Sequence, residues 1–328
     1  MTHVKPLTRR VVVSKTIPEF SQRFIDFAIG GHGEKGKAWL DELPDILEMC
    51  CEKWRLSLGP LVDEIKGNFV GYAQLPDGKE VILKVGVPHP DFSTEMEALA
   101  IYQGRGINLL IDSDRELNAM LLERIHPGKL LNDLDDREEQ TEIVAAVIED
   151  LHRTLPPTGH NLPHFSDWVA SAHRDARECN DLRRARPFLD QFPRVLSLME
   201  ELTTPGEPQL LLHGDLHHWN ILLDEGRGWM AIDPKGVIGA SCLEVGRFLG
   251  NALNQGNTAA EKSQILMNAI RILSDRLCQD QERIFAGALC DFVTANAWGL
   301  KEELEPREPL VAEVRLQVLL QVGEEVSA

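Results

Sequence analysis

The spacing of apolar residues changes along the chain, and it predicts helices first and strands after them. Within residues 18–56 apolar side chains recur every three or four positions, as on one face of a helix, and glycines between residues 30 and 33 divide them into two groups. Within residues 58–85 the pattern becomes that of short strands, at 61–65, 69–75 and 80–85. We therefore expect two helices around a glycine-rich break, followed by three antiparallel strands.

The next segment again carries a helix signal and then strand signals. Ser93 or Thr94 is a suitable N-cap for a helix that stops at the glycines of residues 104–106. Two further strands are then predicted, at 107–112 and 117–123, separated by the polar residues 113–116.

Near residue 125 the spacing of apolar residues changes from that of strands to that of helices. Beyond this point almost every apolar spacing is helical, as in residues 143–151. The change predicts an α+β fold with two lobes, a small strand-rich lobe at residues 1–125 and a larger helical lobe at residues 126–328.

The composition is that of an ordinary globular protein with a negative net charge. Of 328 residues, 43% are hydrophobic and 26% charged, and 52 acidic against 34 basic side chains give a formal charge of −18. Such a charge argues against binding to nucleic acid or to anionic lipid, whereas it suits a cationic ligand or simply keeps the protein in solution. The six cysteines show neither metal-ligand spacing nor the density of a disulfide-rich domain.

The sequence carries no signal-peptide or membrane-span pattern. The apolar run at residues 11–13 follows basic residues but is too short for a signal sequence, and no stretch approaches the roughly 18 apolar residues of a transmembrane helix. We expect a cytoplasmic protein without a membrane partner, and the sequence leaves its oligomeric state open.

Residues 210–233 read LLLHGDLHHWNILLDEGRGWMAID, in which two apolar runs bracket a polar segment. The polar residues that matter here are His213, Asp215, His217 and Asn220 in that segment and Asp233 at the end of the stretch. The pattern predicts a loop between strands that displays polar side chains in a cleft. It resembles the HGDxHxxN motif of aminoglycoside phosphotransferases and of the related choline and homoserine kinases, which is akin to the HRDxxxxN loop of protein kinases.

Two further motifs narrow this resemblance to streptomycin 6-phosphotransferases and hydroxyurea-resistance proteins. They are IDPKG at residues 232–236 and LLERIHPG at residues 121–128, and the resemblance spans roughly residues 57–255. It implies a protein kinase-like two-lobe fold. A helix is predicted to begin near Ser241, so little chain remains for a protein-kinase activation loop, which favours a small-molecule acceptor.

The resemblance assigns a role to each residue of the polar segment. Asp215 would orient the acceptor hydroxyl and accept its proton. Asn220 and Asp233 would hold Mg²⁺, a hard ion that prefers oxygen ligands. His213 and His217 would hold the catalytic loop in place through hydrogen bonds.

In the strand-rich lobe the resemblance assigns the residues that bind ATP. Lys84 lies on an otherwise apolar strand, where a lysine needs an anionic partner, and would contact the α/β-phosphates. Its partner would be Glu95, in the first turn of the next helix, or else Glu97. The alternative is an edge-strand lysine that faces water. Glu123 to Ile125 occupy the hinge position, whose backbone binds adenine.

Other acidic residues and the histidines leave alternatives open. A zinc site at His213 and His217 is one, although the segment has a strand–loop–strand pattern and no cysteine stands at ligand spacing. Glu244 is interpreted as a buried anchor of the loop rather than a ligand contact. Asp167 and Asp175 are candidates for the acceptor pocket or ordinary solvated helix residues.

Together these features predict an enzyme that uses ATP and Mg²⁺ to phosphorylate a hydroxyl group of a small molecule. The expected acceptor is a cationic aminoglycoside antibiotic of the streptomycin type, with resistance as the consequence. Hydroxyurea or another small alcohol is an alternative acceptor. A kinase-like protein that binds nucleotide or antibiotic without turnover is the alternative outside enzymes, and the intact Lys84, Asp215, Asn220 and Asp233 weigh against it.

Overall fold

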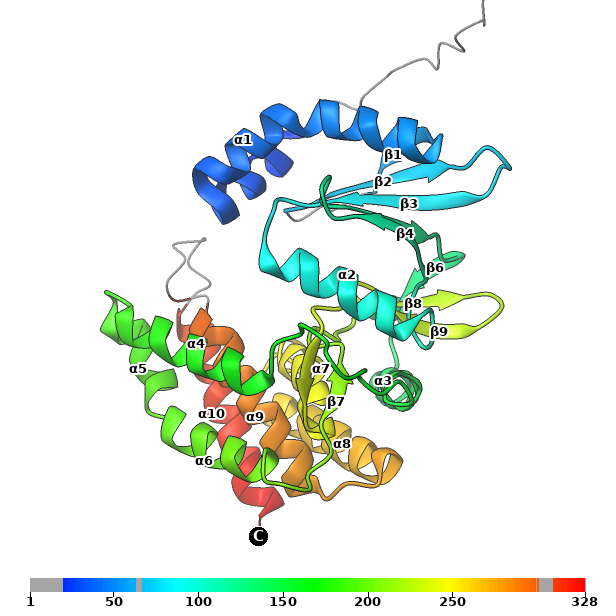
Figure 1. The fold of residues 1–328 in the computed structure, drawn as a ribbon. Coiled ribbons are helices and arrows are strands. Elements are labelled where there is room, and N and C mark those ends of the chain that lie inside the picture. Colours follow the sequence, from blue (N-terminus) through cyan, green and yellow to red (C-terminus); the bar gives the residue numbers. More distant parts are fainter. Residues whose placement is uncertain (1–19, 63–66, 299, 301–308, 328) are drawn as a thin grey trace, which may run out of the picture. The chain divides into compact units, whose positions relative to one another are not determined.

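The computed structural model describes residues 20–62, 67–298, 300 and 309–327. Backbone contacts divide the chain into two compact units, Met1–Val87 and Pro88–Ala328. The functional division into lobes at residue 125 stays a prediction. In the first unit the two predicted helices form one element, α1 (Gln22–Trp54), whose helical backbone is interrupted at Gly33 (Figure 1). This confirms the glycine-rich break.

Two strands of the first unit form the hairpin that the sequence predicts. β2 (Phe69–Gln74) and β3 (Glu80–Val85) pair antiparallel without a register shift. The Asp77 carboxylate accepts a hydrogen bond from the Lys79 N–H at 3.0 Å and stabilises the turn between them.

The first strand begins earlier than predicted. β1 (Ser57–Leu61) pairs antiparallel with β2, whereas the short run LVDEI predicts a strand over 61–65. Its central residues, Gly59 and Pro60, are poor strand formers, which hides the strand from a propensity argument. Residues 63–65 of the predicted strand lie outside the described part of the chain.

The second unit opens with a helix whose start also differs from the prediction. α2 (Pro90–Tyr102) has a proline in its first turn, and the ring of His89 accepts the Asp91 N–H at 3.2 Å. His89 is therefore the N-cap in place of residues 93–94, because proline fits the first helical turn, where no N–H partner is needed. Glu95 consequently lies in the second turn of α2 and not in the first.

The strands after α2 form two further groups. β4 (Leu110–Asp114) and β5 (Ala119–Glu123) pair antiparallel and correspond to the strands predicted at 107–112 and 117–123, although each begins later than predicted. β6 (Pro127–Leu130) pairs with β8 (Ile221–Asp224), which in turn pairs with β9 (Gly228–Ala231).

A third group consists of β7 (Leu210–Leu212) and β10 (Val237–Gly239), which pair antiparallel. Along the chain this pair encloses the β8–β9 hairpin. The connections from β7 to β8 and from β9 to β10 therefore start and end next to each other.

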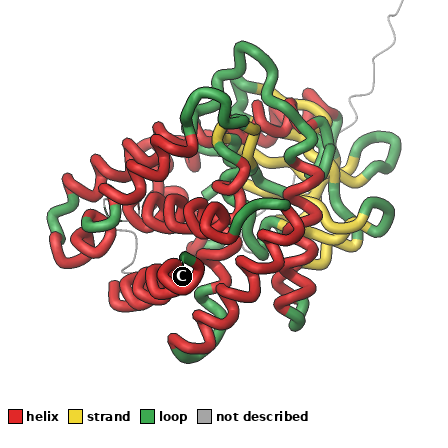
Figure 2. The backbone as a smooth tube through the Cα atoms, turned by 90° about the horizontal axis from the view of Figure 1, so that it is seen from below, coloured by secondary structure: helices red, strands yellow, loops and turns green. Residues whose placement is uncertain are grey.

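Helices form the rest of the second unit, as the helical period predicts (Figure 2). They are α3 (Arg137–Leu151), α4 (Phe165–Glu178), α5 (Leu182–Leu189), α6 (Phe192–Leu202), α7 (Gly246–Ala252), α8 (Ala259–Leu277), α9 (Gln281–Trp298) and α10 (Pro309–Val326). A 3₁₀ helix, Ser241–Val245, precedes α7. Most residues of α9 are buried, because α4, α6, α7, α8 and α10 all pack against it.

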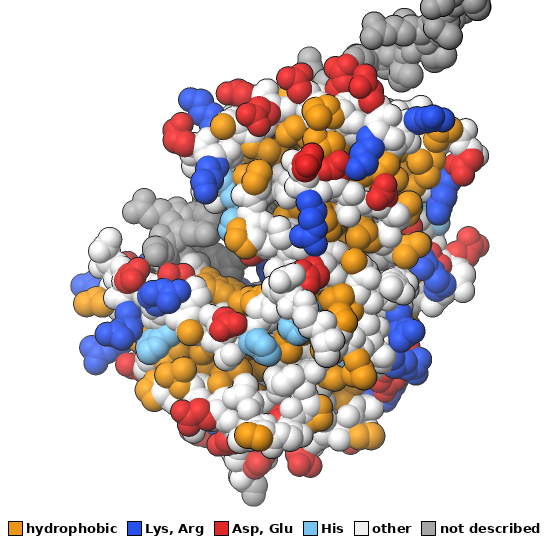
Figure 3. All heavy atoms as spheres, in the orientation of Figure 1, with side chains coloured by type: hydrophobic (Ala, Val, Ile, Leu, Met, Phe, Trp, Pro, Cys, Tyr) orange, Lys and Arg blue, Asp and Glu red, His pale blue; other side chains and the backbone are white. Residues whose placement is uncertain are grey.

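Charged residues of both signs are interspersed on the face that Figure 3 shows, so the negative net charge is not gathered in one patch there. Within the described ranges, none of the helices has the length and apolar character needed to span a bilayer.

Candidate active site

The two connections between the enclosed strand pairs carry the polar motif of the sequence. We call residues 213–220 the Asp215 loop and residues 232–236 the Asp233 loop. Backbone hydrogen bonds join them at both ends: Ile232 N–H donates to Asn220 O at 2.9 Å, and Lys235 N–H donates to His213 O at 2.8 Å. The strand topology therefore explains why residues so far apart in the motif lie side by side.

The start of the Asp215 loop is bound to a buried carboxylate. Glu244, in the 3₁₀ helix before α7, is 2% exposed. Its two oxygens accept the N–H groups of His213 (2.7 Å) and Gly214 (3.1 Å), and His152 Nε2 lies 3.6 Å away. Burial opposes the charge, but His152, His213 and these hydrogen bonds outweigh it and lower the pKa of Glu244. The interpretation of Glu244 as a loop anchor is confirmed.

Gly214 is required by both its conformation and its surroundings. Its φ is +77°, in the left-handed region, and a Cβ atom there would lie 2.8 Å from the Trp168 ring and 2.9 Å from Val237. The chain can therefore pass between these side chains only as glycine. This constrains the backbone directly before Asp215.

Asn220 is oriented by the loop that it ends. Its amide nitrogen donates to the Asp215 backbone oxygen at 2.9 Å. The amide oxygen, at the other end of the planar group, therefore points away from that contact. The hydrogen bond from Ile232 brings Asp233 next to Asn220. Asp233 itself has a φ of +59°, an unusual value for a residue with a side chain, and such strain concentrates at functional sites.

These donors fit a magnesium ion. An amide oxygen and a carboxylate on adjacent, hydrogen-bonded segments are hard ligands, and Mg²⁺ takes few protein ligands of this kind and keeps several waters. The assignment of Asn220 and Asp233 as metal ligands stays a prediction.

The histidines of the Asp215 loop have different surroundings. Both ring nitrogens of His213 have backbone partners, Ile232 O at 2.8 Å and the Asp215 N–H at 3.2 Å, which leaves neither for a zinc ion. His217 Nε2 lies 4.0 Å from Asp215 Oδ2. Burial lowers the pKa of His217, although the Asp215 charge raises it. His218 stacks on Phe248 of α7 with ring centroids 4.5 Å apart.

Asp215 lies among basic side chains. Its side chain is about a quarter exposed, and Arg247 Nε of α7 is 3.5 Å from its Oδ1. Burial raises the pKa of Asp215, but Arg247, His217, Lys235 and His213 outweigh burial and hold the pKa below its usual value. An ionised carboxylate is the form that can accept a proton.

Two residues of this site were not found by sequence reasoning. Arg247 also lies 3.3 Å from Oδ1 of Asp291, a buried residue of α9. Burial and the neighbouring Asp215 and Glu244 raise the pKa of Asp291 to about 6, although Arg247 opposes this. A lone aspartate in the apolar stretch GALCDFV was the available signal, because a buried carboxylate needs a partner.

The predicted ATP-binding residues lie in both units. In the first unit Lys84, on β3, is 5% exposed, which excludes the alternative of a lysine that faces water. In the second unit Glu95 is buried on α2 and Glu123 ends β5. The Glu123 carboxylate accepts the Leu109 N–H at 2.7 Å, and the Glu123 N–H donates to Leu109 O. The pairing of Lys84 with Glu95 and the hinge role of Glu123 and Ile125 stay predictions.

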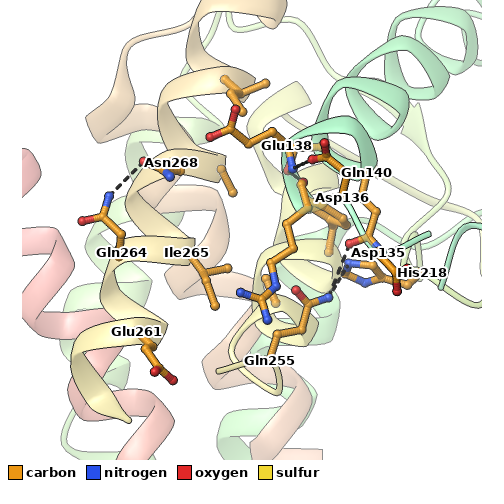
Figure 4. Close-up of a pocket in the computed structure, with 16 residues that line it drawn as sticks. Asp135, Asp136, Glu138, Gln140, His218, Gln255, Glu261, Gln264, Ile265 and Asn268 are labelled. Carbon is orange, nitrogen blue, oxygen red and sulfur yellow. Dashed lines mark hydrogen bonds between the residues drawn. The ribbon is translucent and has the colours of Figure 1, made fainter. Parts of the chain in front are cut away.

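A separate cavity of about 460 Å³ lies between α3, α7 and α8 (Figure 4). His218 is the member of the Asp215 loop that lines it. There Gln255 Nε2 lies 3.3 Å from His218 Nε2 and 3.5 Å from Gln140 Oε1, and the Asn132 N–H donates to His218 O. His218 in the Asp215 loop is thus held by the Gln255 side chain and by the backbone of Asn132.

Comparison with known proteins adds to this geometry. Residues 53–302 match the family model "Aminoglycoside/hydroxyurea antibiotic resistance kinase". The chain is 26% identical to the streptomycin 6-kinase of Streptomyces griseus over 283 residues, which are 84% of this chain and 89% of that protein. It is 27% identical to the hydroxyurea phosphotransferase of Kitasatospora aureofaciens over 308 residues, 92% of this chain and 86% of the relative.

A solved structure gives an independent comparison of the fold. A thermostable mutant of the aminoglycoside phosphotransferase APH(4)-Ia, in a ternary complex with ADP and hygromycin B, superposes with a TM-score of 0.60. The match covers 84% of this chain and 98% of that one at 15% sequence identity. It confirms the kinase-like fold that the sequence predicts.

Proposed function

This chain belongs to the aminoglycoside/hydroxyurea antibiotic resistance kinase family, and we propose that it phosphorylates a hydroxyl group of a streptomycin-type aminoglycoside. Its relatives are kinases and phosphotransferases, so the reaction class is transfer of a phosphoryl group from ATP to an alcohol. The observation that carries the proposal is the hydrogen-bonded pair of loops, in which the Asp215 loop carries an ionised carboxylate and Asn220, and the Asp233 loop adds a second carboxylate suited to magnesium.

In the proposed reaction Asp215 holds the acceptor hydroxyl in line with the γ-phosphorus of ATP and accepts its proton. A bond forms between the acceptor oxygen and the phosphorus, and the bond from that phosphorus to the bridging oxygen of ADP breaks. Positioning supplies most of the acceleration in such transfers, because the two reactants are held in a near-attack geometry. The low pKa of Asp215 keeps the carboxylate ionised at neutral pH.

Asn220 and Asp233 would hold Mg²⁺, which neutralises charge on the phosphates when bound. Lys84 would contact the α/β-phosphates, with Glu95 as its partner. The Glu123 N–H already bonds to Leu109, so the adenine contacts at the hinge would use the Glu123 carbonyl oxygen and the Ile125 N–H. ATP is a cytoplasmic substrate, and the proposal therefore places the reaction in the cytoplasm.

The choice of acceptor rests on similarity and charge. A streptomycin-type acceptor is cationic, and the net charge of −18 favours its approach. Hydroxyurea is the second candidate, because the match to the hydroxyurea phosphotransferase covers 92% of this chain.

The test is release of ADP from MgATP by purified protein with streptomycin, other aminoglycosides, hydroxyurea and simple sugar alcohols. Each acceptor is assayed with the wild type, with Asp215→Ala and with Asp190→Ala, a matched control on an exposed carboxylate at the end of α5. Streptomycin-dependent release that is lost in Asp215→Ala and kept in Asp190→Ala supports the proposal.

Other outcomes separate the alternatives. Release that depends on hydroxyurea alone identifies the second candidate. Release by Asp215→Ala at the wild-type rate contradicts the role of Asp215. Nucleotide binding without release for any acceptor indicates a binding protein that does not turn over.

A further inference from the structure

Arg247 lies between two carboxylates from different parts of the chain. Its Nε is 3.5 Å from Asp215 Oδ1 in the Asp215 loop and 3.3 Å from Asp291 Oδ1 in α9. The Arg247 side chain is 18% exposed and that of Asp291 is 4% exposed. The Arg247 guanidinium group therefore lies next to Asp215 and is largely buried within the second unit.

Close packing of α9 against the start of α7 fixes this arrangement. A Cβ atom at Gly246 would lie 2.2 Å from the Asp291 Cβ, and one at Gly287 would lie 1.9 Å from the Cys242 carbonyl oxygen. These distances are far below van der Waals contact, so only glycine permits the helices to approach. Because α9 lies this close to Gly246, Asp291 comes into contact with Arg247, the next residue along α7.

The charges in this cluster explain why the arginine is held. A buried carboxylate is costly unless a cation compensates it, and Asp291 has Arg247 beside it. The two contacts of Nε lack hydrogen-bond geometry, so Arg247 acts on both carboxylates as a shared charge. Removal of the cation would take away the ion-pair partner of the buried Asp291 and the contact at Asp215 Oδ1.

The contact also distinguishes the two oxygens of Asp215. Oδ1 faces Arg247, whereas Oδ2 lies on the side of His217, at 4.0 Å from its Nε2. A carboxylate held at Oδ1 presents Oδ2 in one direction only.

We propose that Arg247, held from behind by Asp291, is a positioning residue that fixes the Asp215 carboxylate so that Oδ2 receives the acceptor hydroxyl. The role given to Oδ2, which is to receive the acceptor hydroxyl, rests on the proposed function. It assigns Arg247 no contact with the acceptor or the nucleotide.

The kinetic test compares Arg247→Met, Arg247→Lys and Arg276→Met with the wild type. Arg276 is the matched control, because it also lies between two carboxylates, Glu142 and Glu149, but on the surface between α3 and α8. In Arg247→Met the single-turnover rate should fall about 10- to 100-fold, while KM for ATP and acceptor changes less than about threefold. Arg247→Lys should recover part of the rate, and Arg276→Met should match the wild type.

Chemical rescue separates positioning from a general loss of structure. Guanidinium ion at millimolar concentration should restore part of the rate of Arg247→Ala, and urea at the same concentration should not, because only the former replaces the missing charge. Asp291→Asn should lose less than Arg247→Met, since its amide oxygen still faces the guanidinium. A rate for Arg247→Met within twofold of the wild type would overturn the inference.

A structural readout works even without a known acceptor. Crystal structures of the wild type and Arg247→Met should show one Asp215 rotamer in the former and a changed or divided rotamer in the latter. If the wild type released no ADP with any acceptor, the proposed function would fail while this comparison still tested the arginine. An unchanged Asp215 rotamer in Arg247→Met refutes the positioning role, whatever the acceptor.

Discussion

The carboxylate of Glu244 offers the sharpest test of how the Asp215 loop is held. It is buried and accepts the N–H groups of His213 and Gly214 at 2.7 and 3.1 Å. Glu244→Gln keeps the shape of the side chain but provides only one acceptor atom. The amide group of the new side chain then faces one of the two backbone N–H groups, donor against donor.

The magnitude follows from these two losses. A hydrogen bond to a charged group contributes about 1.5–3 kcal/mol, and a buried donor without a partner costs about 1–3 kcal/mol. Both figures describe the loss at the same N–H group, so they are not simply added. We expect the free energy of local opening to fall by about 3 kcal/mol. This corresponds to a decrease of about 100-fold in the protection of these amides from hydrogen exchange.

The assay is hydrogen exchange of peptides that cover residues 211–216, with Glu149→Gln as the control. Glu149 is a partly exposed partner of Arg276, and its loss should change stability by less than about 1 kcal/mol. Exchange in Glu244→Gln within threefold of the wild type would refute the anchoring role.

The pH dependence of amide protection provides a second test of Glu244. The folded-state pKa of Glu244 is lowered, so its stabilisation is complete above the unfolded value of about 4.3 and is lost as pH falls through the folded pKa. Protection of the His213 and Gly214 amides in the wild type should therefore fall in acid. In Glu244→Gln this acid-dependent loss should be absent, because the amide does not titrate.

Three further predictions concern Gly236, with Gly159 as its control, Lys262 and Asn220. Gly236→Ala should lower the free energy of unfolding by about 2–4 kcal/mol in urea titrations, because φ is +71° and the new Cβ would lie 2.7 Å from the Ala98 Cβ. Gly159→Ala, at φ +82° with open space around it, should cost only about 1 kcal/mol. Lys262→Met should cost about 2 kcal/mol, because the Lys262 ammonium donates to three backbone carbonyls after α7; an unchanged urea midpoint would contradict this. Asn220→Ala should raise the Mg²⁺ concentration needed for half-maximal ADP release about tenfold or more, whereas an unchanged requirement would remove Asn220 from the metal site.

The sequence predicts those features that depend on neighbours along the chain. The β2–β3 hairpin, α3 and the break at Gly33 follow from local periodicity and turn residues. The start of α2 differs from the prediction because serine and threonine are the usual N-caps, although the proline at residue 90 already marks the first turn.

The spacing of the motif predicts less than it first suggests. It identifies Asp215, Asn220 and Asp233 as a group, and the enclosed strand pairs explain their proximity. It cannot identify Arg247 or Asp291, because they lie outside the motif, on α7 and α9, and come together near Asp215 only in the folded chain, which leaves no periodic signal.

Two anchors of the Asp215 loop come from one short stretch of chain. Glu244 binds the backbone at the start of the loop, and Arg247, three residues later, lies against the side chain of Asp215. If each has the role argued above, their variants should fail differently. Glu244→Gln should raise amide exchange in the loop, whereas Arg247→Met should lower the transfer rate and leave that exchange unchanged. A loop that responds to both variants in the same way would mean that backbone and side chain are held as one unit, and the separate role of Arg247 would fall.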